Sequence, residues 1–338
     1  MKVVSYPENF VEDILSKFRH IINSGQVAEG KYYNAEDDYI IGKKSVPVNS
    51  CGAALFALLA YQKFQRGKTK IILQSNTMRG LYTLSRLLDF EVIVSDCSIK
   101  PGFLAMDPNS YAKILSSLEN SNDIDKAVTI YSLIGGYFCN AYSEIEDISR
   151  NNDIPLIIDM AHGHYLDSIT MSDYSHLAFS FYGTKILPAG EGGLISTVDI
   201  EMFNWIKRFL IYDRFDYELQ YGLNLRANEL TACIMHELMT QNKWKPFFKD
   251  IRVSIAKKYK KICIEHNINF LDFEDALDYN AYKFIVFDRY DDVLKKNTLL
   301  TKHNPTSPVF AEHLLNKKKI LEHWCPPTYP DLYDSILS

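Results

Sequence analysis

Residues 179–193 read FSFYGTKILPAGEGG and carry an isolated lysine, Lys185, inside a glycine-rich turn. Apolar runs stand on both sides of this turn, at His176–Tyr182 and Gly192–Thr197. Runs with so little polar alternation are typical of strands in a sheet that helices cover on both faces. Similar runs recur upstream between helical patterns, so the sequence predicts an α/β fold with a mostly parallel sheet sandwiched by helices. The other expected strands are Lys70–Ser75, Glu91–Asp96, Ala127–Leu133 and Pro155–Met160, and the expected helices are Ala53–Arg66, Arg79–Leu88, Ser110–Leu118 and Tyr142–Arg150.

The pattern changes after about residue 200, where helical segments dominate. One good strand, Tyr282–Asp288, lies among them, and no linker rich in Pro, Gly or Ser separates the two parts. We therefore predict a large domain over residues 1–235 and a smaller C-terminal α+β domain over residues 236–338, tightly packed on each other. The helices expected in this region are Glu201–Tyr212, Asn228–Asn242, Arg252–His266, Asp291–Lys302 and Ala311–Trp324.

Composition and net charge indicate the cellular compartment of the protein and the classes of partner that it could bind. The 338 residues carry a net charge of -5, which gives no electrostatic reason to expect nucleic acid or an anionic membrane. No run of 18 apolar residues is present, and the start MKVVSYPENF lacks the apolar core of a signal peptide. The six cysteines include no C-x-x-C pair. We expect a cytoplasmic protein with reduced thiols.

The position of Lys185 in this turn suits the formation of an imine by its amine. A lysine that leaves an apolar strand and is partly desolvated can lose its proton and form an imine. Ser180 lies five residues earlier, where its hydroxyl could reach a phosphate group. The ordinary alternative is a solvated lysine on a surface loop.

A second segment, Asn49–Leu55, also suits a phosphate. It reads NSCGAAL and leads from the strand-like Val46–Val48 into a long apolar helix. Free backbone N–H groups at the start of a helix bind phosphate well when no bulky side chain covers them. The alternative is an ordinary helix capped by Ser or Asn.

Asp159 ends the apolar run IIDM, where α/β sheets bind their ligands. A buried carboxylate requires a cationic partner. A protonated pyridine nitrogen is such a partner, and it would make the ring an electron sink. The alternative is a capping aspartate. His162 and His164 stand nearby, but no third ligand follows at the usual spacing, so we expect no metal site.

A fourth segment, Gly222–Ala232, reads GLNLRANELTA and opens a helix, although it could also be a simple loop in which Arg226 is solvated. With it, the chain resembles the DegT/DnrJ/EryC1/StrS family, nucleotide-sugar aminotransferases that use pyridoxal 5'-phosphate (PLP) and share the aspartate-aminotransferase-like fold type I. The similarity is good over roughly residues 8–235 and weak beyond. It rests on residues 23–30 (NSGQVAEG) followed by Glu36, and on residues 49–55, 158–162, 179–193 and 222–232.

This resemblance implies roles for individual residues. Lys185 is the catalytic residue that carries PLP as a Schiff base and moves a proton. Asp159 pairs with the pyridine nitrogen, and His162 lies by the ring and its hydroxyl. Asn224 reaches the phosphate of the neighbouring subunit's cofactor. The phosphate is held by Ser180 and by the backbone of Cys51, Gly52 and Ala53, and the substrate-binding candidates are Tyr182 and Arg226.

Four departures from the family pattern stand out. Cys51-Gly52 replaces the usual Gly-Thr, so a hydroxyl contact is lost. Met78 stands where an aromatic residue usually stacks on the pyridine ring, although a thioether can also pack there. Ile186 replaces a frequent Asn after the lysine. The C-terminal region, which helps to form the sugar-nucleotide site in the family, is short and dissimilar.

The resemblance implies a homodimeric aminotransferase with active sites at the subunit interface. A donor such as L-glutamate would convert PLP to pyridoxamine 5'-phosphate, and the amine would pass to a keto group of a nucleotide-linked deoxysugar. The product would be an amino sugar for a surface polysaccharide or a natural product. Two alternatives stay open. One is a related sugar dehydratase, in which histidine replaces the lysine. The other is a degenerate regulator that binds cofactor or sugar without turnover.

Overall fold

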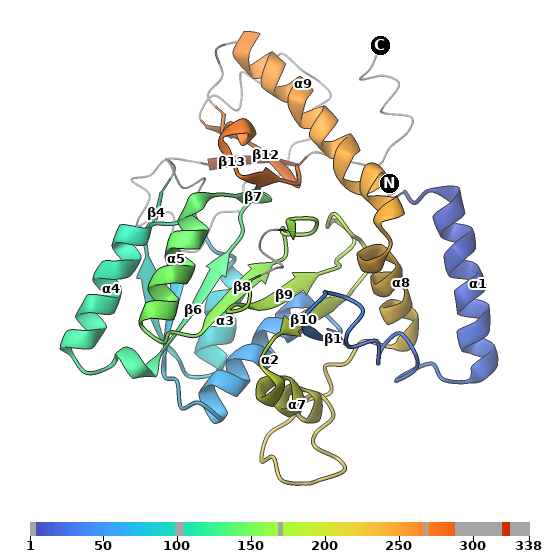
Figure 1. Cartoon of the computed structure of the whole chain (residues 1–338), viewed down its shortest axis with the longest axis horizontal. Coiled ribbons are helices and arrows are strands. Elements are labelled where there is room, and N and C mark those ends of the chain that lie inside the picture. The colour runs from blue at the N-terminus through green and yellow to red at the C-terminus, as the bar shows by residue number, and fades with distance from the viewer. Residues whose placement is uncertain are drawn as a thin grey trace.

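A seven-stranded sheet forms the centre of the computed structural model, which describes residues 5–98, 105–167, 172–265, 267, 270–287 and 320–324 (Figure 1). The strand order across the sheet is β1-β10-β9-β8-β6-β2-β3. β10 runs antiparallel to both of its neighbours, and the other six strands point the same way. The expected mostly parallel sheet is confirmed. The strands are β1 Lys44–Val48, β2 Lys70–Gln74, β3 Glu91–Ser95, β6 Ala127–Ser132, β8 Leu156–Met160, β9 His176–Ser180 and β10 Gly193–Thr197.

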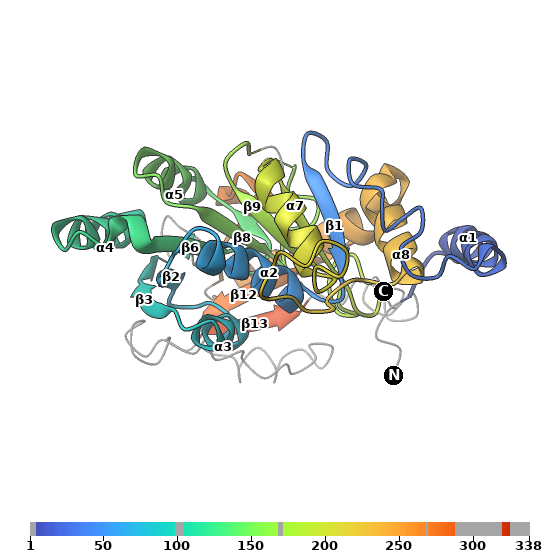
Figure 2. The same cartoon turned by 90° about the horizontal axis from the view of Figure 1, so that it is seen from below.

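Helices cover both faces of this sheet, because successive strand residues point to opposite sides and both sides are apolar. In β2, Ile71 and Leu73 belong to one buried cluster, and Ile72 belongs to the other. The first cluster includes residues of α2, α3 and α7, and the second includes residues of α1, α4, α5 and α8 (Figure 2). These helices are α1 Glu8–Ser24, α2 Cys51–Phe64, α3 Arg79–Leu87, α4 Pro108–Asn120, α5 Asn140–Asn151, α7 Ile200–Phe209 and α8 Glu229–Thr240.

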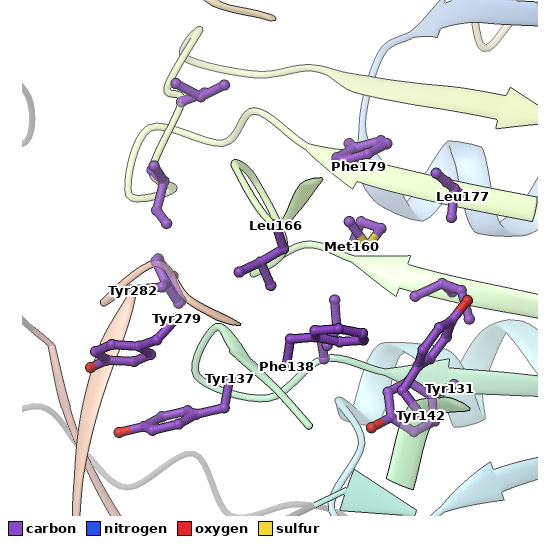
Figure 3. Close-up of a cluster of buried hydrophobic side chains, with 14 of the residues drawn as sticks. Tyr131, Tyr137, Phe138, Tyr142, Met160, Leu166, Leu177, Phe179, Tyr279 and Tyr282 are labelled. Carbon is purple, nitrogen blue, oxygen red and sulfur yellow. The ribbon is translucent and has the colours of Figure 1, made fainter. Parts of the chain in front are cut away.

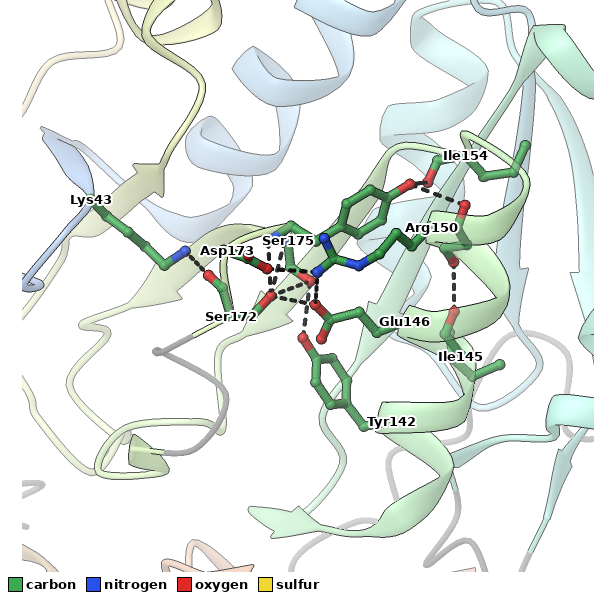
Figure 4. A network of polar contacts seen from close by, with 11 residues as sticks. Lys43, Tyr142, Ile145, Glu146, Arg150, Ile154, Ser172, Asp173 and Ser175 are labelled. Atoms are coloured by element: carbon green, nitrogen blue, oxygen red, sulfur yellow. Dashed lines mark hydrogen bonds and ion pairs between the residues drawn. The ribbon is translucent and has the colours of Figure 1, made fainter.

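A polar network ties α5 to the start of β9, the strand that leads into the lysine turn (Figure 4). Arg150 Nη2 lies 3.2 Å from Glu146 Oε1 and 2.6 Å from Asp173 Oδ1. The hydroxyl groups of Tyr142 and Ser175 share a hydrogen bond of 2.9 Å. The contacts of Arg150 with Asp173 and of Tyr142 with Ser175 tie the segment that leads into β9 to α5.

The segment after α7 differs from the expected helix, which was to continue to Tyr212. Tyr212 and Asp213 have φ values of 60° and 50°, which a right-handed helix does not allow. The buried carboxylate of Asp213 accepts hydrogen bonds from Arg208 Nε and Nη2 at 2.8 and 2.9 Å. It also accepts the backbone N–H groups of Glu218 and Leu219 at 2.6 and 2.7 Å. A loop organised around this carboxylate therefore replaces the last turn.

The C-terminal part contains α9 Ile251–Glu265 and a strand pair, β12 Lys283–Phe287 with β13 Ile320–Trp324. The helix expected at Ala311–Trp324 is wrong over its last five residues, which form β13. Antiparallel pairing with β12 overrides the local helical pattern there. Residues 311–319 and the helix expected at Asp291–Lys302 lie outside the described residues.

Several short elements complete the described chain. Among the residues described, no helix is both long enough and apolar enough to cross a membrane. The predicted domain boundary after residue 235 falls within α8, and the division stays a prediction. The short elements are the strands β4 Cys97–Ser98, β5 Ala105–Met106, β7 Tyr137–Phe138 and β11 Asp278–Tyr279, the 3-10 helices Ile124–Lys126, Asn242–Trp244 and Phe273–Asp275, and the π-helix Pro246–Asp250.

Candidate active site

Lys185 lies in the turn between β9 and β10, and backbone hydrogen bonds shape this turn. The N–H of Lys185 donates to the carbonyl of Tyr182 at 2.8 Å, and that of Gly183 donates to the carbonyl of Gly190 at 2.9 Å. Gly190 has a φ of 89°, which side-chain-bearing residues rarely adopt. The amine Nζ of Lys185 lies 5.1 Å from the ring centroid of Tyr282. Backbone hydrogen bonds therefore fix the turn that carries the partly buried Lys185.

Asp159 is the penultimate residue of β8 and is only 6% exposed. Its Oδ1 accepts the backbone N–H of Ala161 at 2.9 Å and faces the Cys51 thiol at 3.8 Å. Burial raises the pKa of the carboxyl, while the Ala161 bond and the charge of Lys185 oppose that rise. Both contacts fall on Oδ1, and no described residue donates a hydrogen bond to Oδ2. A carboxylate of this kind fits a cationic ring nitrogen as its missing partner.

The start of α2 lies close to the end of β9. Ser50 caps the helix, and its Oγ accepts the N–H of Ala53 at 3.1 Å. That N–H is therefore already used, and among the described residues the N–H groups of Cys51 and Gly52 meet no acceptor. A Cβ on Gly52 would find only Ser50 Oγ nearby, at 3.7 Å, so space is open there. The two free N–H groups are better candidates for a phosphate than Ala53.

Ser180 is held beside this helix start. It pairs with Gly193 of β10, and a Cβ on Gly193 would come within 2.3 Å of the Ser50 carbonyl oxygen. The absence of that Cβ lets β10 and the helix start approach closely. The Cys51 side chain turns away toward the sheet, where Sγ lies 3.7 Å from the carbonyl of Ala178. The pKa of this thiol is raised well above its usual value, by burial first and then by Asp159, so the thiol stays neutral.

His162 follows Asp159 and is neutral. Burial, followed by the charges of Lys185 and Lys283, holds the pKa of His162 well below its usual value. Its Nδ1 accepts the backbone N–H of Gly135 at 3.2 Å, so the ring proton is on Nε2. The ring stacks near that of Tyr282, with 4.3 Å between the centroids.

His164 does not join His162 in a metal site. It is fully buried between Phe179 and Phe181, with ring centroids 5.5 and 5.0 Å away, and burial lowers its pKa to about 3. Over the described part of the chain, no cluster of three or more His, Cys, Asp or Glu side chains is placed to hold a metal ion.

Three residues near Lys185 were not singled out from the sequence: Asn280, Tyr282 and Lys283. Asn280 Nδ2 donates to the carbonyls of His162 and His164 at 2.6 and 2.9 Å. Tyr282 also belongs to the buried cluster that contains Tyr137, Phe138 and Tyr279 (Figure 3). The sequence signal for Tyr282 and Lys283 was the expected strand Tyr282–Asp288, which begins with them; the family resemblance is weak in this region.

Among the described residues, the side chains of Asn224, Arg226, Tyr182 and Met78 make no hydrogen bond or ring contact with Lys185, Asp159 or His162. Asn224 is exposed, and its Oδ1 accepts Nε of Arg226 at 3.2 Å, while Arg226 also pairs with Glu29. Met78 is 58% exposed at the start of α3, and Tyr182 is 48% exposed. The segment of Asn224 runs beside the phosphate-loop candidate, because the N–H of Asn49 donates to the carbonyl of Leu225 at 2.8 Å.

Glu229, the acidic residue of the segment GLNLRANELTA, has a structural task. It is 1% exposed, and its carboxylate accepts the N–H groups of Gly30, Tyr32 and Tyr33 at 3.1, 2.8 and 2.9 Å. Gly30 leaves the necessary room, since a Cβ there would lie 2.7 Å from Glu229 Cδ. Glu229 thus fastens the loop after α1 to α8.

Removal of this carboxylate is expected to destabilise the protein. In Glu229→Ala, the buried N–H groups of Gly30 and Tyr33 lose their acceptor, at a cost of roughly 2–5 kcal/mol in the free energy of unfolding. Urea denaturation measures this loss. Glu144→Ala, at an exposed position on α5, is the matched control and should change the value by less than about 0.5 kcal/mol. Equal stability of the two variants would contradict the fastening role.

The model of the DegT/DnrJ/EryC1/StrS aminotransferase family matches residues 8–298. The Bacillus subtilis spore coat polysaccharide biosynthesis protein SpsC is 27% identical over 193 residues, which cover 55% of this chain and 47% of SpsC. The chain covers less than half the length of the curated relatives that it matches.

Two solved structures show the fold. The structure of S. venezuelae DesV has a TM-score of 0.79 at 17% identity, covering 98% of this chain and 94% of DesV. That of Helicobacter pylori PseC, an aminotransferase involved in the biosynthesis of pseudoaminic acid, has a TM-score of 0.74 at 15% identity, covering 98% and 95%. The expected fold type I architecture is confirmed. With the family model spanning most of its length, this chain belongs to the DegT/DnrJ/EryC1/StrS aminotransferase family.

Proposed function

We propose that this protein is a PLP-dependent aminotransferase that moves an amino group from a donor such as L-glutamate to a keto group of a nucleotide-linked deoxysugar. One observation carries the proposal. The buried Asp159 carboxylate has one oxygen without a hydrogen-bond donor among the described residues, and it feels the charge of Lys185. A cofactor with a cationic ring nitrogen and an aldehyde would give Asp159 an ionic partner and the Lys185 amine a group with which to form an imine.

The residues present fit the cofactor. Lys185 would hold PLP covalently, Asp159 would pair with its ring nitrogen, and Ser180 with the N–H groups of Cys51 and Gly52 would hold its phosphate. When bound, PLP supplies an electron sink that stabilises negative charge on the carbon next to the transferred nitrogen.

The side chains of the site then have separate tasks. The Asp159 carboxylate keeps its cationic partner protonated, which an opposite charge does by shifting the partner's pKa by about 1–3 units. The Cys51 thiol, kept neutral by its raised pKa, donates toward Oδ1 and helps to orient this carboxylate. The neutral His162 can donate from Nε2. Once released, the Lys185 amine can carry a proton between two carbon atoms, and such help is typically worth about 10²–10⁴ in rate.

The acceptor class is supported by what the relatives do. The names of SpsC and PseC place those proteins in the biosynthesis of a spore coat polysaccharide and of pseudoaminic acid. By analogy, we propose that the product of this protein is an amino sugar. Lys185 itself favours transamination over the dehydratase alternative, in which histidine stands at that position.

An absorbance spectrum of the purified protein with PLP, before and after L-glutamate, tests the proposal. We expect a visible band from the lysine-bound cofactor and its loss on addition of L-glutamate or another amino acid. Keto-sugar nucleotides should then restore the band. A band that no amino acid changes would favour the dehydratase or the regulator. The absence of any band would end the PLP proposal.

The proposal includes a homodimer in which Asn224 reaches the partner's cofactor phosphate. The loop that precedes Asn224 supports this, because Tyr212, Phe215 and Tyr217 expose 58%, 71% and 81% of their side chains. Aromatic residues so exposed are typical of an interaction surface.

Asn224→Asp is expected to weaken the retention of PLP roughly tenfold, because it places a negative charge near a phosphate. Dialysis followed by absorbance measures the retention. Asn228→Asp makes the same charge change at the cap of α8, where Asp caps as well as Asn does, and should retain PLP normally.

Mixed dimers test whether the site is shared. In hybrids of Lys185→Met and Asn224→Asp subunits, one of the two sites would contain both native residues. A one-to-one mixture should therefore recover about a quarter of the native activity if the subunits exchange freely. Hybrids that are verified by mass but recover nothing would contradict the shared site.

A further inference from the structure

The hydroxyl of Tyr6 donates a hydrogen bond to the carbonyl of Pro188 at 2.7 Å. Tyr6 stands just before α1, whereas Pro188 lies in the turn between β9 and β10, shortly after Lys185. Burial raises the pKa of Tyr6 to about 12, so the hydroxyl keeps its proton and stays a donor at neutral pH. This contact joins the N-terminal segment to the turn that carries the lysine.

The Pro188 carbonyl depends on this hydroxyl. Pro188 is buried, and among the described residues no backbone N–H donates to its carbonyl. The neighbouring N–H, that of Ala189, is directed elsewhere and donates to the carbonyl of Phe181 at 2.7 Å. A buried carbonyl that loses its donor destabilises the conformation to which it belongs. Tyr6 thus completes the hydrogen bonds of the turn from a distant part of the chain.

The chain between Lys185 and Pro188 is packed in the core. Ile186 and Leu187 are 1% and 0% exposed. The N–H of Lys185 itself donates to the carbonyl of Tyr182 at 2.8 Å. Because closely packed side chains cannot shift independently, a displacement of the Pro188 carbonyl would also move the backbone of Lys185.

The Tyr6 ring is itself held in place. It stacks on Phe10 with 5.0 Å between the ring centroids, and Phe10 meets Trp244 edge to face at 5.1 Å. The indole N–H of Trp244 donates to the carboxylate of Glu237 at 3.0 Å, and Lys17 of α1 pairs with the same buried carboxylate. These contacts anchor α1 to α8, beside which it runs (Figure 1), and they fix the point from which Tyr6 reaches the turn.

We propose that Tyr6 is a positioning residue, whose hydroxyl holds the turn of Lys185 in the geometry that the reaction needs. The inference rests on the proposed function, in which the Lys185 amine first holds the cofactor and then moves a proton between two carbon atoms. Such a transfer is sensitive to placement, and a shift of about 1 Å can cost roughly 100-fold in rate. The Tyr6 hydroxyl acts only through the backbone of the turn.

The test compares two variants of the full-length protein. Tyr6→Phe removes the hydroxyl and keeps the ring that stacks on Phe10. Tyr174→Phe is the matched control, because its hydroxyl is also partly buried and also donates to a backbone carbonyl at 2.7 Å, that of Ile154, before the start of β8. Both variants should lower the midpoint of urea denaturation by a similar small amount.

Hydrogen–deuterium exchange of the PLP-free proteins measures the turn directly. In Tyr6→Phe, residues 181–190 should exchange roughly 5- to 100-fold faster than in the native protein, as for a buried carbonyl that has lost its donor. In Tyr174→Phe, exchange in this segment should be unchanged. Native exchange of the turn in Tyr6→Phe would overturn the inference.

The PLP-loaded proteins separate positioning from binding. With L-glutamate, the maximal rate at which the visible band disappears should be roughly 10- to 100-fold lower in Tyr6→Phe. The L-glutamate concentration that gives half of this rate should stay within about threefold, because the hydroxyl does not touch the donor. Tyr174→Phe should match the native protein in both quantities.

The contrary outcomes are distinct. A raised half-saturating concentration with a native maximal rate would assign Tyr6 to substrate binding and overturn the inference, as would equal losses of rate in both variants. A native maximal rate in Tyr6→Phe would overturn the inference alone and leave the proposed function standing. If no amino acid bleaches the band of the native protein, the proposed function is wrong, and the role of Tyr6 in the reaction falls with it.

Discussion

Lys185→Met protein is expected to show no visible absorbance band with PLP and to lose at least about 10⁴-fold in turnover. The substitution removes both the amine that holds the cofactor and the base that moves the proton, so two contributions to the rate are lost together. Absorbance titration with PLP and a transamination assay measure the two effects.

Lys283→Met is the matched control for this change. It also removes a lysine amine from near the Tyr282 ring, but not the amine that is expected to hold the cofactor. The band should survive in Lys283→Met and disappear in Lys185→Met. Turnover by Lys185→Met with added PLP would contradict the catalytic role that we assign to Lys185. A band that survives in Lys185→Met and vanishes in the double variant would show that Lys283 can hold the cofactor.

Asp159→Asn is expected to separate function from stability. The amide keeps the shape of the side chain and can still accept the N–H of Ala161, but it can no longer hold a cationic ring nitrogen protonated. A shift of 1–3 pKa units corresponds to roughly 10- to 1000-fold, and we expect a loss of this size in the half-reaction with L-glutamate.

The same substitution, Asp159→Asn, should not lower the stability of the PLP-free protein. Burial raises the folded-state pKa of Asp159 above its unfolded value. The carboxyl therefore favours folding at low pH, and this contribution is lost as the pH rises through the raised pKa. At pH 7 the Asn variant should be at least as stable as the native protein in urea denaturation.

Asp199 offers the contrast, because it is an ordinary capping aspartate. Its Oδ1 accepts the N–H of Met202 at 2.9 Å at the start of α7. Asp199→Ala should cost about 1 kcal/mol of stability and leave PLP binding unchanged. If Asp159→Asn behaves like Asp199→Ala, the alternative of a capping residue is correct for Asp159.

Sequence reasoning worked best for candidate site residues that lie at the carboxyl ends of strands. Asp159 and Ser180 lie at the carboxyl ends of two parallel neighbouring strands, and the carboxyl ends of parallel strands meet at one edge of the sheet. Apolar runs of five or six residues were therefore enough to bring distant parts of the chain together. The expected strands of this sheet agree with the observed ones to within two residues at each end.

Sequence reasoning could not identify the hydrogen-bond partners of individual side chains. The phosphate loop was expected to use the N–H of Ala53, but the Ser50 hydroxyl takes it first. The sequence also did not reveal that the Cys51 thiol faces Asp159. Side-chain rotamers decide such contacts, and no pattern of residue types specifies them.

The sequence by itself determined the α/β architecture, the lysine turn and the segments that form the site, because hydrophobic periodicity and glycine-rich turns are local properties of the chain. Only the tertiary structure decided that Ile320–Trp324 is a strand and that the amines of Lys185 and Lys283 lie near the Tyr282 ring. Both depend on hydrogen bonds between segments far apart in the chain, such as that from Lys283 N–H to the Gly135 carbonyl. Partners of this kind have no local signature, since they are chosen only when the chain packs.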